Sequence, residues 1–157
     1  MELKFKVSGR IARPVEDVFE AVVNPAELSR YFTTGGAKGR LETGATVYWD
    51  FHDFPGAFPV EVVSVEKDRK IVLRWDAGDV DPAGPEATEA SYRTTVTMTF
   101  EPLDDGRTLV TIAEEGWRET PNGLSASYGN CQGWTQMLCA LKAYREYGIN
   151  LREGMYK

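Results

Sequence analysis

The sequence has few of the residues that metal, redox and nucleotide sites require. Its 157 residues include only two cysteines, Cys131 and Cys139, and one histidine, His52. Zinc sites take three or four protein ligands, so we expect no metal site. The pair Gly35-Gly36 lacks both the Lys-Ser/Thr of a P-loop and the spacing of a dinucleotide fingerprint. We therefore expect no bound cofactor.

Basic residues and long apolar runs are also scarce. Eighteen Lys and Arg stand against 24 Asp and Glu, a formal net charge of −6. Nucleic-acid binding needs clustered Lys and Arg, so nucleic acid is not an expected partner. No apolar run approaches the roughly 20 residues that span a bilayer, and the N-terminus lacks a basic leader followed by an apolar core. We expect a cytoplasmic protein without a signal peptide or membrane span.

A long amphipathic helix is the main feature of the C-terminal part. Trp134, Leu138 and Leu141 recur at steps of three and four, the spacing of one helix face. Thr120-Pro121 offers a capping hydroxyl followed by a proline, Ser125 or Ser127 could cap a later start, and Gly148 offers a stop. The cysteines are eight residues apart on this helix, roughly 12 Å, which is beyond disulfide reach. We expect two buried thiols.

Almost everything before this helix is strand-like. Alternating, β-branched or aromatic segments predict strands at 2–11, 46–52, 58–66, 71–75, 91–100 and 108–115. Two short helices are predicted after the first strand, at about 14–22 and 24–30, the second with Asn24 as its cap and Pro25 at its first position. Residues 33–39 are predicted to be a loop, and the acidic, Pro- and Gly-rich stretch 77–90 a mobile exposed loop.

This order of elements predicts an α+β fold in one domain, residues 1–157. Short sequential connections favour an antiparallel sheet, and a long sheet with one long helix available curls around that helix. The expected result is a helix-grip arrangement with the apolar helix face against the concave side of the sheet.

Four segments resemble one known family. They are I-A-R-P-V-E-D-V-F-E-A-V at 11–22, N-P-A-E-L-S-R-Y-F at 24–32, V-L-R-W at 72–75 and G-W-T-Q-M-L-C-A-L-K-A-Y at 133–144. In this order and spacing they resemble the Hsp90 ATPase activator homologue-like family of the START-related helix-grip (SRPBCC) superfamily. The resemblance implies a curved sheet around the C-terminal helix, with a mainly apolar cavity between them that opens near the short helices.

Two polar residues are candidates for a role inside such a cavity. Glu114 follows Val110 and Ile112 on strict alternation and is predicted to point toward the core, where a carboxyl has a raised pKa and can serve as acid, base or polar anchor. A surface position at the strand end is the alternative. Asn130 lies one turn before Trp134, and it either meets backbone at the helix start or donates a hydrogen bond at the cavity mouth.

The bulky apolar side chains of the helix stripe and the strands complete the predicted cavity. Indole rings would give rigid walls with N–H donors, and a flexible Met adapts to irregular shapes. The predicted ligand-binding residues are Phe32, Trp49, Val60, Trp75, Met98, Ile112, Glu114, Asn130, Trp134, Met137 and Leu141.

The sequence therefore predicts a protein that binds a small apolar or amphipathic molecule, such as a lipid, without a cofactor or catalytic residues. One alternative is a cofactor-free enzyme of the polyketide cyclase or hydrolase type that uses Glu114 or His52 with cavity tyrosines. The other is a co-chaperone-like interaction module that uses a surface patch. Self-association as a homodimer stays open.

Overall fold

Seven antiparallel strands and three helices make up the described part of the chain. The computed structural model describes residues 1–52, 54–79 and 91–155. The sheet has the order β1-β7-β6-β5-β4-β3-β2. The elements are β1 (Leu3–Ile11), α1 (Val15–Val23), α2 (Pro25–Leu28), β2 (Gly36–Lys38), β3 (Thr46–Phe51), β4 (Phe54–Glu66), β5 (Lys70–Asp76), β6 (Arg93–Pro102), β7 (Thr108–Trp117) and α3 (Pro121–Tyr147).

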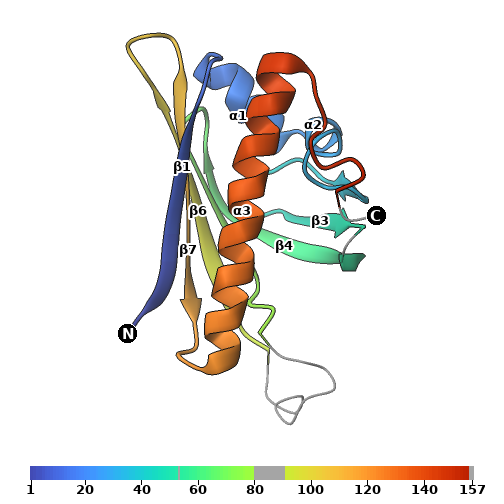
Figure 1. Cartoon of the computed structure of the whole chain (residues 1–157), viewed down its shortest axis with the longest axis vertical. Helices are drawn as coiled ribbons and strands as arrows, with labels where there is room; N and C mark the ends of the chain where they lie inside the picture. The colour runs from blue at the N-terminus through green and yellow to red at the C-terminus, as the bar shows by residue number, and fades with distance from the viewer. Residues whose placement is uncertain (53, 80–90, 156–157) are drawn as a thin grey trace.

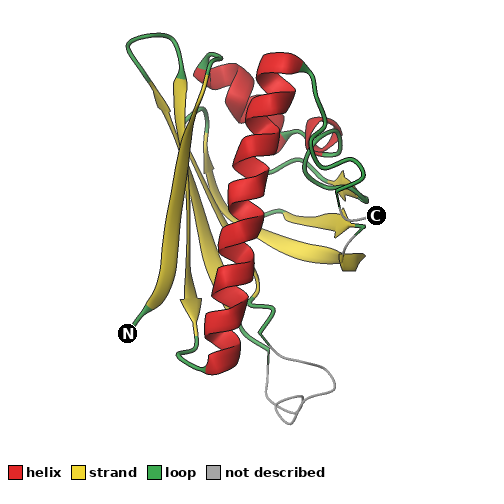
Figure 2. Cartoon of the chain, in the orientation of Figure 1, coloured by secondary structure: helices red, strands yellow, loops and turns green. Residues whose placement is uncertain are grey.

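The long helix α3 lies lengthwise against one face of the curved sheet. Figure 1 shows β1, β6 and β7 on one side of α3 and β3 and β4 on the other, with α1 near the C-terminal end of α3. Figure 2 shows that helix and sheet form two layers, with the strands turning around the helix. This is the predicted helix-grip α+β fold, and it places the concave face of the sheet opposite the apolar stripe of α3.

Helix α3 begins at the earlier of the two predicted starts and ends at the predicted stop. The Thr120 side chain accepts a hydrogen bond from the backbone N–H of Gly123 at 3.0 Å, and Pro121 is the first helical residue. Gly148 ends the helix in the left-handed conformation, with φ 70°. The stripe that includes Trp134 and Leu141 is buried. Burial of this one face against the sheet explains why the helix can be 27 residues long with a largely polar outer side.

The strand alternation fixes which side chains form the core. On β6 the buried residues alternate with more exposed ones, and Val96 and Met98 are wholly buried. Val96 pairs with Glu114 of β7 and Met98 pairs with Ile112, so the same inward face continues from strand to strand. The core therefore lies between this face and α3.

The structure differs from the sequence-based predictions at residues 36–38 and at the two cysteines. Residues 36–38, expected to lie in a loop, form β2, because Ala37 pairs with Trp49 of β3 and the sheet supplies hydrogen-bond partners that the local sequence does not reveal. Cys139, expected to be buried, is exposed on α3, and Cys131 is half-buried. Most of the predicted loop 77–90 lies outside the described residues.

Neither a membrane-spanning helix nor a metal-ligand cluster is found among the described residues. None of their helices is long and apolar enough to cross a membrane. In the same part of the chain, no group of three or more His, Cys, Asp and Glu side chains is arranged to hold a metal ion.

Candidate functional site

A buried carboxylate is the polar centre of the interior. Glu114 follows Val110 and Ile112 on the inward face of β7, and its side chain is only 1% exposed. The next residue, Glu115, is exposed, as alternation requires. The predicted inward orientation of Glu114 is therefore what the structure shows, and the alternative of a solvent-exposed strand end applies to Glu115 instead.

Four side chains from three elements donate hydrogen bonds to Glu114. Oε1 accepts from the indole Nε1 of Trp134 at 2.8 Å and from Nδ2 of Asn130 at 3.1 Å. Oε2 accepts from Nε1 of Trp75 at 2.9 Å, from Oγ1 of Thr94 at 2.6 Å and from Nδ2 of Asn130 at 3.0 Å. Helix α3 and strands β5 and β6 are thus tied to β7 through one carboxylate.

Two opposing effects act on the pKa of the Glu114 carboxyl. Burial raises the pKa of Glu114 above its ordinary value of 4.5, and this is the larger influence. The hydrogen bonds from Thr94, Trp75, Trp134 and Asn130 lower the pKa and partly offset the burial. A carboxyl in this setting can anchor polar groups or accept a proton, but both its oxygens are already engaged.

Aromatic rings extend from Glu114 toward β3. The Trp75 and Trp134 ring centroids lie 5.4 Å apart, and Trp49 packs edge-on to them at 5.9 and 6.4 Å. Phe32, which follows α2, packs against Trp49 at 5.5 Å and Trp134 at 5.6 Å. Phe51 joins through Phe32 at 5.1 Å. We call these five residues the aromatic cluster.

Two polar atoms in this region lack partners. The Trp49 indole Nε1 and the Thr33 Oγ1 are buried and have no hydrogen-bond partner among the described residues. Both side chains are 0% exposed. An unpaired buried donor or acceptor costs about 1–3 kcal/mol of folding free energy, so such atoms are uncommon in folded proteins.

A charged side chain covers the outer rings of the cluster. Arg152, which follows α3, is only 5% exposed. Its guanidinium carbon lies 5.6 Å from the ring centroid of Phe32 and 5.7 Å from that of Phe51. The C-terminal segment in Figure 1 accordingly turns back from the end of α3 toward α2 and the strands beside it.

The structure brings the predicted site residues together to different degrees. Phe32, Trp49, Trp75, Glu114, Asn130 and Trp134 are linked by the ring contacts and hydrogen bonds above. The other five predicted residues belong to the same hydrophobic core and are at most 1% exposed: Val60, Met98, Ile112, Met137 and Leu141. Their role in ligand binding stays a prediction.

Four residues of this region were missed. Thr94 and Phe51 lie on predicted strands, and the alternation of Thr94 with Val96 and Met98 was a usable signal for its inward orientation. Thr33 and Arg152 follow helix ends, where no periodicity exists to reveal burial.

His52 does not join the site. Its side chain is exposed, whereas Glu114 is buried. The exposed position of His52 therefore does not support the alternative in which His52 acts as a catalytic residue inside the cavity.

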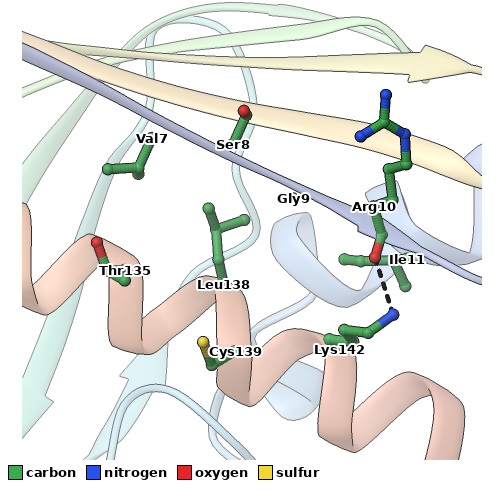
Figure 3. A pocket seen from close by; sticks show the side chains of 9 residues that line it. All are labelled: Val7, Ser8, Gly9, Arg10, Ile11, Thr135, Leu138, Cys139 and Lys142. Carbon is green, nitrogen blue, oxygen red and sulfur yellow. Dashed lines mark hydrogen bonds between the residues drawn. The ribbon is translucent and has the colours of Figure 1, made fainter.

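A surface groove of about 520 Å³ lies between β1 and α3, away from every predicted site residue. In Figure 3, Leu138 points from the helix toward β1, and the Lys142 amine donates to the Arg10 carbonyl at 2.9 Å. Gly9 sits at an inward position of β1 where an added Cβ would meet no atom within 4 Å. A side chain at this position would therefore extend into the groove. Its full lining is Val7, Ser8, Gly9, Arg10, Ile11, Thr135, Leu138, Cys139 and Lys142.

Several solved structures have the same fold as this chain. Protein SSP2350 of Staphylococcus saprophyticus is 23% identical, over 95% of this chain and 96% of that one, with a TM-score of 0.72. The Aha1 dimer of Colwellia psychrerythraea is 19% identical, over 92% and 97%, with a TM-score of 0.70. DynU16, from the dynemicin biosynthetic locus, is 25% identical over 94% of this chain and 49% of its own length, with a TM-score of 0.74. No curated protein matches the sequence.

The sequence itself matches a known family across most of its length. The match covers residues 12–146, from the residue after β1 to the last turn of α3, and so includes Glu114 and the four side chains that donate hydrogen bonds to it. The fold and the sequence match agree, and the chain belongs to the family described as Activator of Hsp90 ATPase homolog 1-like protein, in the START-related helix-grip (SRPBCC) superfamily.

Proposed function

We propose that this protein binds a small amphipathic molecule between the sheet and α3, with the apolar part of the ligand against the aromatic cluster. The observation that carries the proposal is the fully buried indole N–H of Trp49 in that cluster, which has no hydrogen-bond partner in the part of the chain that the structure describes. A ligand hydroxyl, carbonyl or ether oxygen would accept this hydrogen bond and recover the free energy that the unpaired donor costs.

The rigidity of the cluster supports specific binding. Trp75 and Trp134 are held by hydrogen bonds to opposite oxygens of Glu114, so their rings cannot rotate without breaking these bonds. Aromatic walls fixed by a polar network, with one convergent donor, are typical of small-molecule sites. Entry of a ligand requires the rings of Trp49 and Phe32 to separate, because both are buried in the ligand-free arrangement.

The hydrogen bonds of Glu114 favour binding over catalysis. Its four donors come from two indoles, one hydroxyl and one amide, and none of these groups titrates near neutral pH. A general acid–base mechanism needs a proton acceptor within reach of the substrate, and here both carboxylate oxygens are already occupied. We therefore assign Glu114 the role of positioning the two indoles.

The proposal is tested with prodan, a neutral dye that has an environment-sensitive naphthalene ring and a carbonyl acceptor. We expect saturable binding to the wild type, with blue-shifted emission from an apolar site. Trp49→Phe keeps an aromatic ring and removes the N–H, so it should weaken binding about fivefold to twentyfold, the value of one buried hydrogen bond.

Trp117→Phe is the matched control. Trp117 is also a buried tryptophan, but its indole N–H donates to the Ala77 carbonyl at 3.1 Å and its ring stacks on Phe5 rather than on the cluster. This substitution should leave prodan affinity unchanged. Equal losses in both variants, or no saturable binding to the wild type, would reject the proposed function.

A further inference from the structure

The C-terminal segment is attached to the rest of the molecule through one buried side chain. Between Gly148 and Met155, Arg152 is the single buried residue, and the others are exposed. Ile149, Leu151 and Met155 keep 51%, 42% and 45% of their surface accessible, whereas Arg152 keeps 5%, so Arg152 is the most completely buried residue of this segment. Segments with few buried contacts open at low free energy, so release of Arg152 would release this stretch.

The surroundings of the Arg152 guanidinium favour a positive charge. Its guanidinium lies within 6 Å of two ring centroids, those of Phe32 and Phe51, the range in which a cation is attracted to an aromatic face. Trp134, which packs against Phe32, donates a hydrogen bond to the carboxyl of Glu114, so a carboxyl lies behind the aromatic cluster. Aromatic faces in front and a carboxyl farther in both favour a cation over an anion at this position.

We propose that Arg152 occupies the cation subsite of the ligand site, and that the ligand is an amphipathic amine or quaternary ammonium compound that displaces it. This inference rests on the proposed function and specifies its ligand class. The ligand cation takes the place of the guanidinium over Phe32 and Phe51, and its apolar part extends toward Trp49 and Trp134. The C-terminal segment acts as an intramolecular competitor that covers the cluster until the ligand arrives.

The test compares two probes of one shape, benzyltrimethylammonium and its neutral carbon isostere neopentylbenzene, by competition against bound prodan. In the wild type, the cation should bind about fivefold more tightly than the isostere, the value of a partly desolvated cation–π contact. Arg152→Met keeps an apolar stem and removes the competing charge. It should raise the affinity for the cation by about tenfold, because the site is then open in most molecules.

Two controls distinguish a cation subsite from a simple latch, in which Arg152 only holds the C-terminal segment in place and the ligand needs no positive charge. Arg74→Met changes an exposed arginine on β5 and should alter neither affinity. Arg152→Lys keeps a positive charge, so it should restore most of the wild-type competition. If Arg152→Met raises both affinities equally, or if the wild type does not prefer the cation, Arg152 is only a latch and the cation subsite is rejected. Prodan binding that depends on Trp49 would persist in that case, so the proposed function would stand.

A measurement on the unmodified protein covers the possibility that Arg152 variants fold poorly. Trypsin cleaves after arginine, and the buried Arg152 side chain should be protected. Saturating benzyltrimethylammonium should increase cleavage at Arg152 by at least about fivefold relative to cleavage at Arg69, whose side chain is 76% exposed in a turn. The neutral isostere should change this ratio less. An unchanged ratio with the bound cation would reject displacement of Arg152.

Discussion

Trp75 and Trp134 donate their indole N–H groups to opposite oxygens of one carboxylate, that of Glu114, while their ring centroids lie 5.4 Å apart. One tryptophan comes from β5 and the other from α3, and the acceptor comes from β7. This arrangement fixes the spacing between helix and sheet by hydrogen bonds as well as by packing. The consequences for stability can be tested one residue at a time.

The first prediction concerns the pH dependence that Glu114 imposes. Its pKa is raised in the folded state, so the unfolded state loses this proton at lower pH than the folded state. Between 4.5 and the raised pKa, ionisation therefore favours unfolding. The unfolding free energy of the wild type, minus that of Glu114→Gln, should fall as pH rises from about 4 to about 7.

Urea denaturation at several pH values measures this difference. The control is Glu115→Gln, which changes the exposed neighbour on the same strand. A difference for Glu114→Gln that stays constant with pH, or rises, would contradict the raised pKa.

The second prediction compares two glycines of α3. An added Cβ at Gly123 would lie 2.0 Å from the Arg118 carbonyl oxygen, a backbone atom that cannot move aside. Gly123→Ala should therefore destabilise the protein by about 1–3 kcal/mol. At Gly129 a Cβ meets nothing within 4 Å, and Gly129→Ala should stabilise by about 0.5–1 kcal/mol through helix propensity. Thermal unfolding followed by circular dichroism distinguishes the two signs, and a shared sign would be inconsistent with this helix geometry.

The third prediction compares two leucines of the buried helix face. Leu141 is 0% exposed, so Leu141→Ala should leave an enclosed cavity and cost about 3–5 kcal/mol. Leu138 is 7% exposed and lines the groove beside β1, so Leu138→Ala enlarges an existing groove and should cost about 2–3 kcal/mol. Chemical denaturation of both variants gives the values. A larger loss at Leu138 would mean that the groove closes in solution.

The fourth prediction fills that groove. Gly9 has no positive φ, and no atom lies within 4 Å of its missing Cβ, so a side chain fits without backbone strain. Gly9→Val should stabilise the protein by about 0.5–1 kcal/mol through strand propensity and added apolar contact. Because the groove is separate from the aromatic cluster, prodan affinity should not change. Loss of prodan binding in Gly9→Val would locate the dye in the groove instead.

Local patterns predicted most of the secondary structure and the direction of individual side chains. Alternation placed Glu114 on the inward face, and helical spacing placed Asn130 one turn from Trp134. That these side chains share hydrogen bonds depends on β5, β6 and β7 pairing in the register that sets Trp75 opposite Thr94 and Val96 opposite Glu114. Pairing register is a property of the assembled sheet, so periodicity within each strand could not supply it.

The inward face of β3 and the burial of Arg152 could not be predicted from the sequence, for a different reason. Tyr48, Trp49 and Phe51 put aromatic side chains on both faces of one strand, so the sequence could not tell which face is inward. The structure buries Trp49 and leaves Tyr48 46% exposed. Arg152 follows the last helix, and its burial depends on the path of the chain after Gly148 rather than on any local pattern.

The position of β1 has a consequence for synthesis on the ribosome. Its sheet neighbour is β7, and the pairing joins Leu3 to Trp117 and Phe5 to Glu114. Because β7 follows β1 by about 100 residues, β1 cannot pair until roughly 5–20 seconds of further translation have passed. During that interval Phe5, Val7 and Ile11 have neither β7 nor α3 to cover them. The apolar face of β1 therefore stays uncovered until α3 has been made.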